Sequence, residues 1–219
     1  GVAPLLPPDR VASLVADNGR FPPLAAWLGR AFLRRLRAEE VRAELRAQML
    51  RAVATGLPFS HIDGHHHVHL FAPVAGIVAA LAREFGIPIV RRVAPARRAP
   101  GPGEPGLASP KGRFLAAADA RWGGDYAGLA RTNAFRGVAF PTDLPGWATL
   151  ARSCGAGVTE IMCHPGLRDP AVGALDGNIA QREVELRWLC DPRVAAIFAA
   201  EGVAIGSFAP LARPRGAAA

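Results

Sequence analysis

Apolar residues recur at helical spacing in several long stretches of the chain. In residues 38–55, Val41, Leu45 and Met49 follow one another at intervals of four, which predicts an amphipathic helix. Similar spacing predicts further helices over residues 24–36, 71–85, 114–130, 143–154, 178–189 and 192–201. Glycine marks several of the ends, as Gly56 does for residues 38–55 and Gly86 for residues 71–85.

Short runs rich in β-branched or other apolar residues lie between these helices. They predict strands over residues 61–70, 87–93, 137–140, 158–163 and 203–208. Because strands alternate with helices, the pattern indicates an α/β chain with a mainly parallel sheet. Five strands are fewer than the eight that close a (β/α) barrel.

One segment, residues 94–112, is rich in proline, glycine and arginine and has no periodicity. We interpret it as an excursion over a site rather than as a linker between domains. The chain has 219 residues, and half of them are apolar, which is enough for a sizeable core. The sequence therefore predicts a single domain over residues 1–219.

The net charge of +8 comes from 26 basic and 18 acidic residues. Arginine is most concentrated in residues 30–51, where it alternates with Glu39, Glu40 and Glu44. That alternation favours a solvated helix face with ion pairs over a nucleic-acid surface. A basic nucleic-acid binder is the less favoured alternative, and its affinity would fall steeply with salt.

Cysteine usage and hydropathy bear on the compartment. Three cysteines without a Cys-x-x-Cys pair predict a reducing compartment, and we expect a cytoplasmic protein. No apolar run is long enough to span a bilayer, and no signal peptide opens the chain. We therefore expect no membrane span.

Five of the six histidines fall within residues 61–70. If this segment is a strand, alternate side chains share one face. The residues on that face would be His61, Asp63, His65, His67 and His69. Imidazoles beside a carboxylate offer nitrogen ligands to a divalent metal and an acceptor that fixes a ligand's tautomer. An expression tag is excluded because only three histidines are consecutive, which leaves a solvated histidine-rich loop as the alternative.

The sixth histidine, His164, follows the predicted strand over residues 158–163. Catalytic groups of α/β folds collect where parallel strands end, so the two histidine motifs are expected to converge on one rim. The alternative for His164 is a ring satisfied by local backbone. Cys163 precedes it, but neighbouring strand residues point to opposite faces, so we expect Cys163 to be a small buried residue rather than a nucleophile.

Both motifs resemble those of a known family. The run His-Ile-Asp-Gly-His-His-His-Val-His, residues 61–69, closely resembles the Thr-His-x-Asp-Ser-His-His-His-Val-His signature of YdjC-like carbohydrate deacetylases, which include chitooligosaccharide deacetylases and a hopanoid-associated branch. Glu-Ile-Met-Cys-His-Pro, residues 160–165, resembles the family's Glu-x-Met-Cys-His-Pro segment. The resemblance implies a distorted (β/α) barrel and a hydrolase that removes acetyl groups from N-acetylated amino sugars.

The resemblance also implies roles for individual residues. The family holds a divalent metal ion, Mg or Zn, with one Asp and two His, and the second His falls on His65. His164 is expected to donate the proton to the leaving amine or to hydrogen-bond the substrate, and Asp63 to orient an imidazole. His67 and His69 stay open as ligands, supporting residues or packed neighbours. Arg91 or Arg92 would bind a sugar hydroxyl or acetyl oxygen, with a surface ion pair as the alternative.

The family's remaining ligands belong to segments that precede the part matched here. Its Asp lies in an Asp-Asp-Phe-Gly motif, which would also supply the base and which this sequence lacks. We therefore expect an N-terminally truncated, incomplete barrel whose uncovered sheet edge leads to aggregation or homodimerisation. The alternative to a deacetylase acting on a small carbohydrate is an inactive remnant that binds metal or carbohydrate without catalysis.

Overall fold

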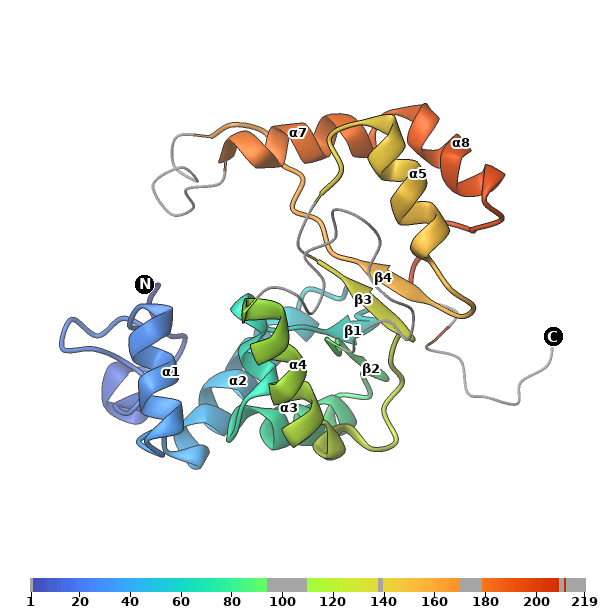
Figure 1. Ribbon diagram of the computed structural model, residues 1–219. Helices are drawn as coiled ribbons and strands as arrows, with labels where there is room; N and C mark the ends of the chain where they lie inside the picture. The colour runs from blue at the N-terminus through green and yellow to red at the C-terminus, as the bar shows by residue number, and fades with distance from the viewer. Residues whose placement is uncertain (1, 94–109, 138–139, 170–178, 209–210, 212–219) are drawn as a thin grey trace. The chain divides into compact units, whose positions relative to one another are not determined.

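The computed structural model describes residues 2–93, 110–137, 140–169, 179–208 and 211 (Figure 1). These residues belong to two compact units. Unit 1 comprises Gly1–Arg92, Phe114–Arg131 and Phe208–Ala219, and unit 2 comprises Val93–Arg113 and Thr132–Ser207. Each unit combines helices with two short parallel strands, which confirms the α/β class. The single-domain interpretation stays a prediction.

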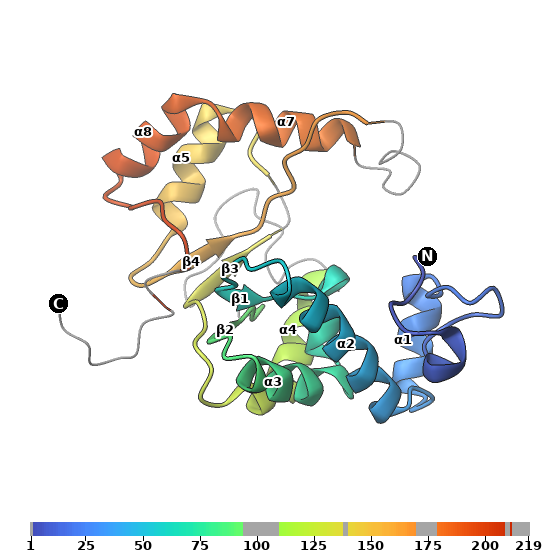
Figure 2. The ribbon, with the colours of Figure 1, turned by 180° about the vertical axis from the view of Figure 1, so that it is seen from behind.

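Unit 1 is built around one βαβ arrangement. In chain order it contains η1 (Pro8–Val11), α1 (Leu24–Phe32), α2 (Ala38–Val53), β1 (His61–Ile62), η2 (His65–Leu70), α3 (Val74–Glu84), β2 (Ile89–Val90), most of α4 (Pro110–Trp122) and η3 (Gly123–Tyr126). β1 and β2 pair in parallel, with His61 opposite Ile89, and α3 connects them. In both views α2 lies beside α3 (Figure 1 and Figure 2).

The helix periodicity places the core of unit 1 correctly. Val74, Val78 and Leu81 recur at intervals of three or four on α3, and all three are buried. Gly86 follows α3 with a φ of +65°, a left-handed conformation that suits glycine and ends the helix as predicted.

Two buried carboxylates on α2 hold the N-terminal loop. Glu44 accepts the backbone N–H groups of Leu5 and Leu6, each at 3.0 Å. Glu40 accepts the Ser13 N–H at 2.7 Å. The predicted helix over residues 38–55 is confirmed by α2, but its buried face includes these acidic residues, which the apolar pattern alone does not identify.

Unit 2 repeats the same architecture on a smaller core. It contains β3 (Ala134–Arg136), α5 (Leu144–Ser153), β4 (Thr159–Ile161), α7 (Ile179–Leu189) and α8 (Pro192–Ala200). β3 and β4 pair in parallel, and α5 connects them. The core consists of Trp147, Leu150, Ala151, Val194 and Phe198. Asp143 caps α5 by accepting the Gly146 N–H at 2.7 Å.

Two strand predictions need correction. Within residues 61–70 the paired strand ends at Ile62, because the 3-10 helix η2 begins at His65. Residues 203–208 form no strand, and the third strand, β3, lies at Ala134–Arg136, whereas the predicted strand over residues 137–140 falls partly outside the described residues. The excursion over residues 94–112 lies mostly outside the described residues. The barrel stays a prediction.

Candidate functional site

The histidine loop, residues 63–69, has a compact rather than an extended backbone. Gly64 is extended, but His66 and His67 have φ values of 52° and 60° inside η2. These values lie in the left-handed region that residues with a Cβ rarely adopt. The side chains therefore do not alternate between two faces, and the predicted row of five aligned side chains is wrong.

His69 ties the two ends of this loop to the neighbouring strand. Its Nδ1 accepts the Gly64 N–H at 2.9 Å, and its Nε2 lies 2.9 Å from the Arg91 carbonyl oxygen. Because Nδ1 accepts, the proton must be on Nε2, which donates to Arg91. The His69 carbonyl in turn accepts the hydroxyl of the buried Tyr126. Both ring nitrogens are occupied, so His69 is a structural histidine rather than a metal ligand.

Burial keeps the His69 ring neutral. The side chain is 1% exposed, and desolvation lowers its pKa below the ordinary value of 6.5, although the Arg91 carbonyl opposes the shift. Desolvation also lowers the pKa of His61, which is half-buried at the start of the loop. A neutral ring is required at His69, since a protonated Nδ1 could not accept from Gly64.

The position before His65 has no room for a side chain. A Cβ on Gly64 would lie 2.8 Å from His69 Nδ1 and 3.1 Å from its backbone nitrogen. The resembled family signature has serine here. Glycine therefore allows the close approach between the loop and the His69 ring.

The carboxylate of Asp63 forms an ion pair with the Arg91 guanidinium. Asp63 is 43% exposed, whereas Arg91 is 13% exposed, so the pair lies at the surface with the cation turned inward. In the part of the chain that the structure describes, Asp63 makes no hydrogen bond to an imidazole. Its predicted role as an orienting acceptor for a histidine stays a prediction.

Arg92 has a structural rather than a substrate-binding environment. Its Nε and Nη2 donate to the two Asp119 carboxylate oxygens at 2.5 and 2.8 Å, and its Nη1 donates to the Gly123 carbonyl at 3.1 Å. Both partners are buried. A Cβ on Gly123 would lie 2.0 Å from Arg92 Nη2, so glycine is required there. Sequence reasoning missed Asp119, whose signal is a lone carboxylate among the apolar residues of α4.

His65 presents its ring to solvent. The residue is exposed, and its ring lies against that of His66, with centroids 4.0 Å apart and planes at 50°. Within the described ranges, no hydrogen bond engages the His65 ring nitrogens. His67, by contrast, is buried. Of the two, His65 is therefore the one whose ring is accessible to a ligand.

His164 lies in unit 2, in the turn that follows β4. Its backbone N–H donates to the buried carboxylate of Glu185 on α7, and its carbonyl accepts from Arg182 Nη1 at 3.5 Å. The ring is exposed, and no hydrogen bond from the described residues reaches it. Glu185 was missed from the sequence, although its spacing of three from Arg182 places both on one face of α7.

The structure leaves the convergence of the two motifs untested. His65 and Asp63 belong to unit 1 and His164 to unit 2, so their meeting on one rim stays a prediction. Among the residues the structure describes, no three His, Cys, Asp or Glu side chains form a group that could hold a metal ion.

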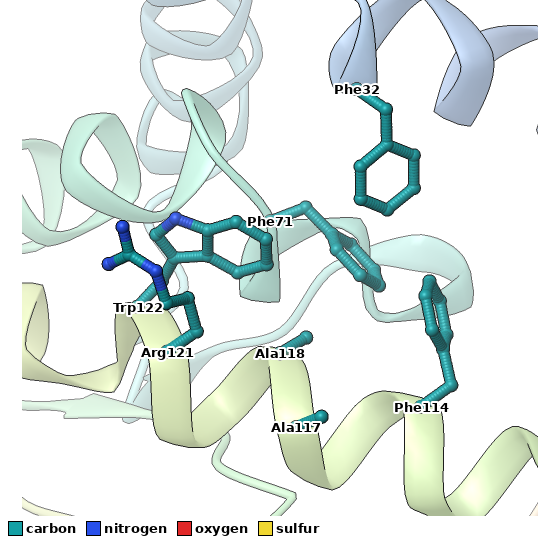
Figure 3. Close-up of a pocket in the computed structure, with 7 residues that line it drawn as sticks. All are labelled: Phe32, Phe71, Phe114, Ala117, Ala118, Arg121 and Trp122. Atoms are coloured by element: carbon teal, nitrogen blue, oxygen red, sulfur yellow. The ribbon is translucent and has the colours of Figure 1, made fainter.

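A separate aromatic hollow of ≈ 220 Å³ lies in unit 1 (Figure 3). Its lining consists of Phe32, Phe71, Phe114, Ala117, Ala118, Arg121 and Trp122. Figure 3 shows the three phenylalanine rings grouped together, with the Arg121 guanidinium beside the Trp122 indole. The lining contains neither an imidazole nor a carboxylate, so the hollow is distinct from the histidine loop.

No helix among the described residues is long and apolar enough to cross a membrane.

The family model for YdjC-like proteins matches residues 1–200. The chain belongs to the YdjC-like family. It is 32% identical over 197 residues to a carbohydrate deacetylase of Geobacillus stearothermophilus, an alignment that covers 88% of this chain and 66% of that protein. It is also 32% identical over 210 residues to a chitooligosaccharide deacetylase of Serratia marcescens, covering 94% of this chain and 73% of the relative.

A solved structure resembles the fold of this YdjC-like chain. A protein from Enterococcus faecalis V583, provisionally described as a cellobiose-phosphate cleavage protein, superimposes with a TM-score of 0.73 at 24% identity. The match covers 96% of this chain and 73% of that one. This YdjC-like chain spans about two thirds of the length of the Geobacillus relative. Its alignment with a Brevibacillus brevis carbohydrate deacetylase covers 30% of that protein.

Proposed function

We propose that this chain is part of a carbohydrate deacetylase that hydrolyses the acetamide of an N-acetylated amino sugar or oligosaccharide. The observation that carries the proposal is the family match over residues 1–200, together with relatives named carbohydrate and chitooligosaccharide deacetylases. The two motifs from which the resemblance was inferred both lie inside that match.

The exposed histidines support a division of roles. Amide hydrolysis requires attack by water on the carbonyl carbon and a proton for the departing amine nitrogen. His164 is exposed at the end of a strand and would donate that proton, since its ring nitrogens are accessible. Asp63, whose carboxylate pairs with the Arg91 guanidinium, would be a second catalytic group on the histidine loop.

A divalent metal ion, Mg or Zn, is part of the proposal only through His65. In the histidine loop His65 is an exposed imidazole, but the described residues gather no complete ligand set, so they do not fit a metal by themselves. Further donors from outside the described residues would be needed. Imidazole suits Zn²⁺, whereas Mg²⁺ prefers an all-oxygen octahedron.

The finer features of the whole protein follow the same reasoning. We infer a distorted (β/α) barrel, which the βαβ arrangement of each unit and the likeness to the Enterococcus structure support. The substrate would be a small carbohydrate. A reducing, cytoplasmic location rests on the three cysteines, none of which forms a disulfide. Homodimerisation stays a prediction.

The test is to incubate the chain with an N-acetylated chitooligosaccharide and Mg²⁺ or Zn²⁺, and to measure released acetate together with the new free amine. The expected result is equal release of both, which disappears in His164→Ala. A remnant without catalysis is the second candidate, favoured by the incomplete ligand set. It predicts carbohydrate binding by calorimetry with no acetate under any metal, and that outcome would overturn the deacetylase.

A further inference from the structure

We propose that His69 is a positioning residue for this reaction, because its ring fixes the backbone that carries His65 and Asp63. The inference rests on the proposed deacetylase, since it states what prepares that site. His69 itself touches no reacting group: its effect passes through Gly64, the residue before His65, and through Arg91, the partner of Asp63.

His69 makes three hydrogen bonds, one within the loop and two to segments beside it. Nδ1 receives the N–H of Gly64, five residues earlier, and Nε2 donates to the carbonyl of Arg91, 22 residues later. The Tyr126 hydroxyl holds the His69 carbonyl from a third direction. One ring thus joins the start of the loop, the end of β2 and, through its own backbone, η3.

The loop needs such a support because its backbone is unfavourable on its own. His66 and His67 both have left-handed φ values, and conformations of this kind persist only where the surrounding contacts determine them. Without the bridge, Gly64 and the two following residues would be free to adopt ordinary extended conformations. The direction of the His65 ring would then vary.

The His69 ring must accept the Gly64 N–H and donate to the Arg91 carbonyl, and only a neutral ring with an acceptor and a donor on opposite sides does both. Asparagine places an amide oxygen near Nδ1 and can keep the bond from Gly64. Glutamine places an amide nitrogen near Nε2 and can keep the bond to Arg91. Leucine fills the space and keeps neither, so three substitutions separate the two contacts from packing.

The experiment compares His69→Asn, His69→Gln and His69→Leu with a matched control outside the loop, Val78→Ala, which removes buried core contacts on α3. Acetate release is measured below the melting transition of every variant. We expect His69→Leu to lower kcat by about 10–100-fold, the usual range for residues that orient a functional histidine, with little change in KM. His69→Asn should retain the most activity, and Val78→Ala should keep its kcat.

A spectroscopic readout separates positioning from stability. Long-range ¹H–¹⁵N spectra should show His69 as the neutral Nε2–H tautomer, and the Gly64 amide should exchange slowly in the wild type and quickly in His69→Leu. An Nδ1–H tautomer, or equal kcat in all folded variants, would overturn the proposal. If the wild-type chain releases no acetate, the deacetylase fails for this chain. Gly64 exchange then decides alone: faster exchange in His69→Leu supports positioning, and unchanged exchange overturns it.

Discussion

The histidine loop of unit 1 and the His164 turn of unit 2 each present an exposed imidazole, but they are supported differently. In the loop a neutral side chain from the motif itself, His69, bonds to backbone groups. At His164 the support is a charged side chain from α7. Glu185 accepts the backbone N–H of His164, 21 residues earlier in the chain. One motif thus contains its own support, and the other depends on a second element.

This difference shows which substitutions should separate function from folding. Removing an exposed ring leaves both supports in place, whereas removing a support leaves a buried backbone group without a partner. The neutral support is sensitive to protonation in acid, and the charged one is sensitive to removal of its carboxylate.

The largest effect is expected from removing the exposed rings. His164→Ala should lower the deacetylation rate by about 10²–10⁴-fold if the ring is the general acid, while the melting temperature stays near that of the wild type. His65→Ala should abolish the deacetylation activity. Acetate release and thermal melting of the same samples check this. A wild-type rate in either variant would remove that residue from the site.

Metal content distinguishes the two rings. His65→Ala should lose any Zn²⁺ retained by the active protein, whereas His164→Ala should keep it. Inductively coupled plasma analysis of the dialysed samples measures this. If His164→Ala also loses metal, His164 is a ligand and the assigned roles are reversed.

The next effect concerns the buried ion pair of unit 1. Asp119→Ala leaves the Arg92 guanidinium buried without its carboxylate, and breaking such a pair costs about 3–5 kcal/mol. Asp125→Ala, at an exposed position shortly after α4, is the control and should change stability little. Urea denaturation followed by circular dichroism measures both. Equal stability of the two variants would show that Arg92 finds another partner.

A smaller effect should follow at the support of the His164 turn. Glu185→Ala removes the acceptor of the part-buried His164 N–H, so the cost should stay below the roughly 1–3 kcal/mol of a fully buried unsatisfied group. Glu185→Gln keeps an oxygen acceptor and should lose less. The two variants, compared by urea denaturation and by kcat, test whether acceptance or charge matters. If glutamine is as damaging as alanine, the negative charge itself is required.

The smallest effect is a gradual loss of stability in acid. Burial lowers the pKa of His69 below 6.5, so the unfolded chain binds the extra proton and stability declines as pH falls below that value. Glu40 adds a second loss below 4.5: burial opposes its ionisation, but the Ser13 hydrogen bonds and Arg37 lower its pKa overall. Melting temperatures across this range should decline in two stages. His69→Asn should lack the His69 part of the first stage and keep the part due to His61, whose pKa burial also lowers.

Helix periodicity predicted most of the fold because burial decides where apolar faces point. α2, α3, α5, α7 and α8 all lie within the ranges predicted for them. The strand over residues 61–70 failed because alternation was read from histidines, which are neither strongly apolar nor strongly β-forming. The segment instead contains two left-handed residues, and His69 in it bonds to the Arg91 carbonyl just after β2, a distant contact that the local sequence does not reveal.

The candidate site was predictable as a motif but not as an arrangement. The sequence identified His65 and His164, and both prove exposed. It could not distinguish them from His67 and His69, because burial of those two rings arises from packing in unit 1. Asp119 and Glu185 were missed for the same reason, since each acts on a residue more than 20 positions away.

The left-handed backbone at His66 and His67 has a consequence for how this motif tolerates sequence drift. A run of histidines is usually taken to signify metal affinity, yet the middle positions of this run are also constrained by torsion angle. Glycine and asparagine enter that region easily, while valine, isoleucine and threonine do not. His66→Gly should therefore lower the free energy of unfolding less than His66→Val does, by about 1–2 kcal/mol, which is the strain of a left-handed residue with a Cβ.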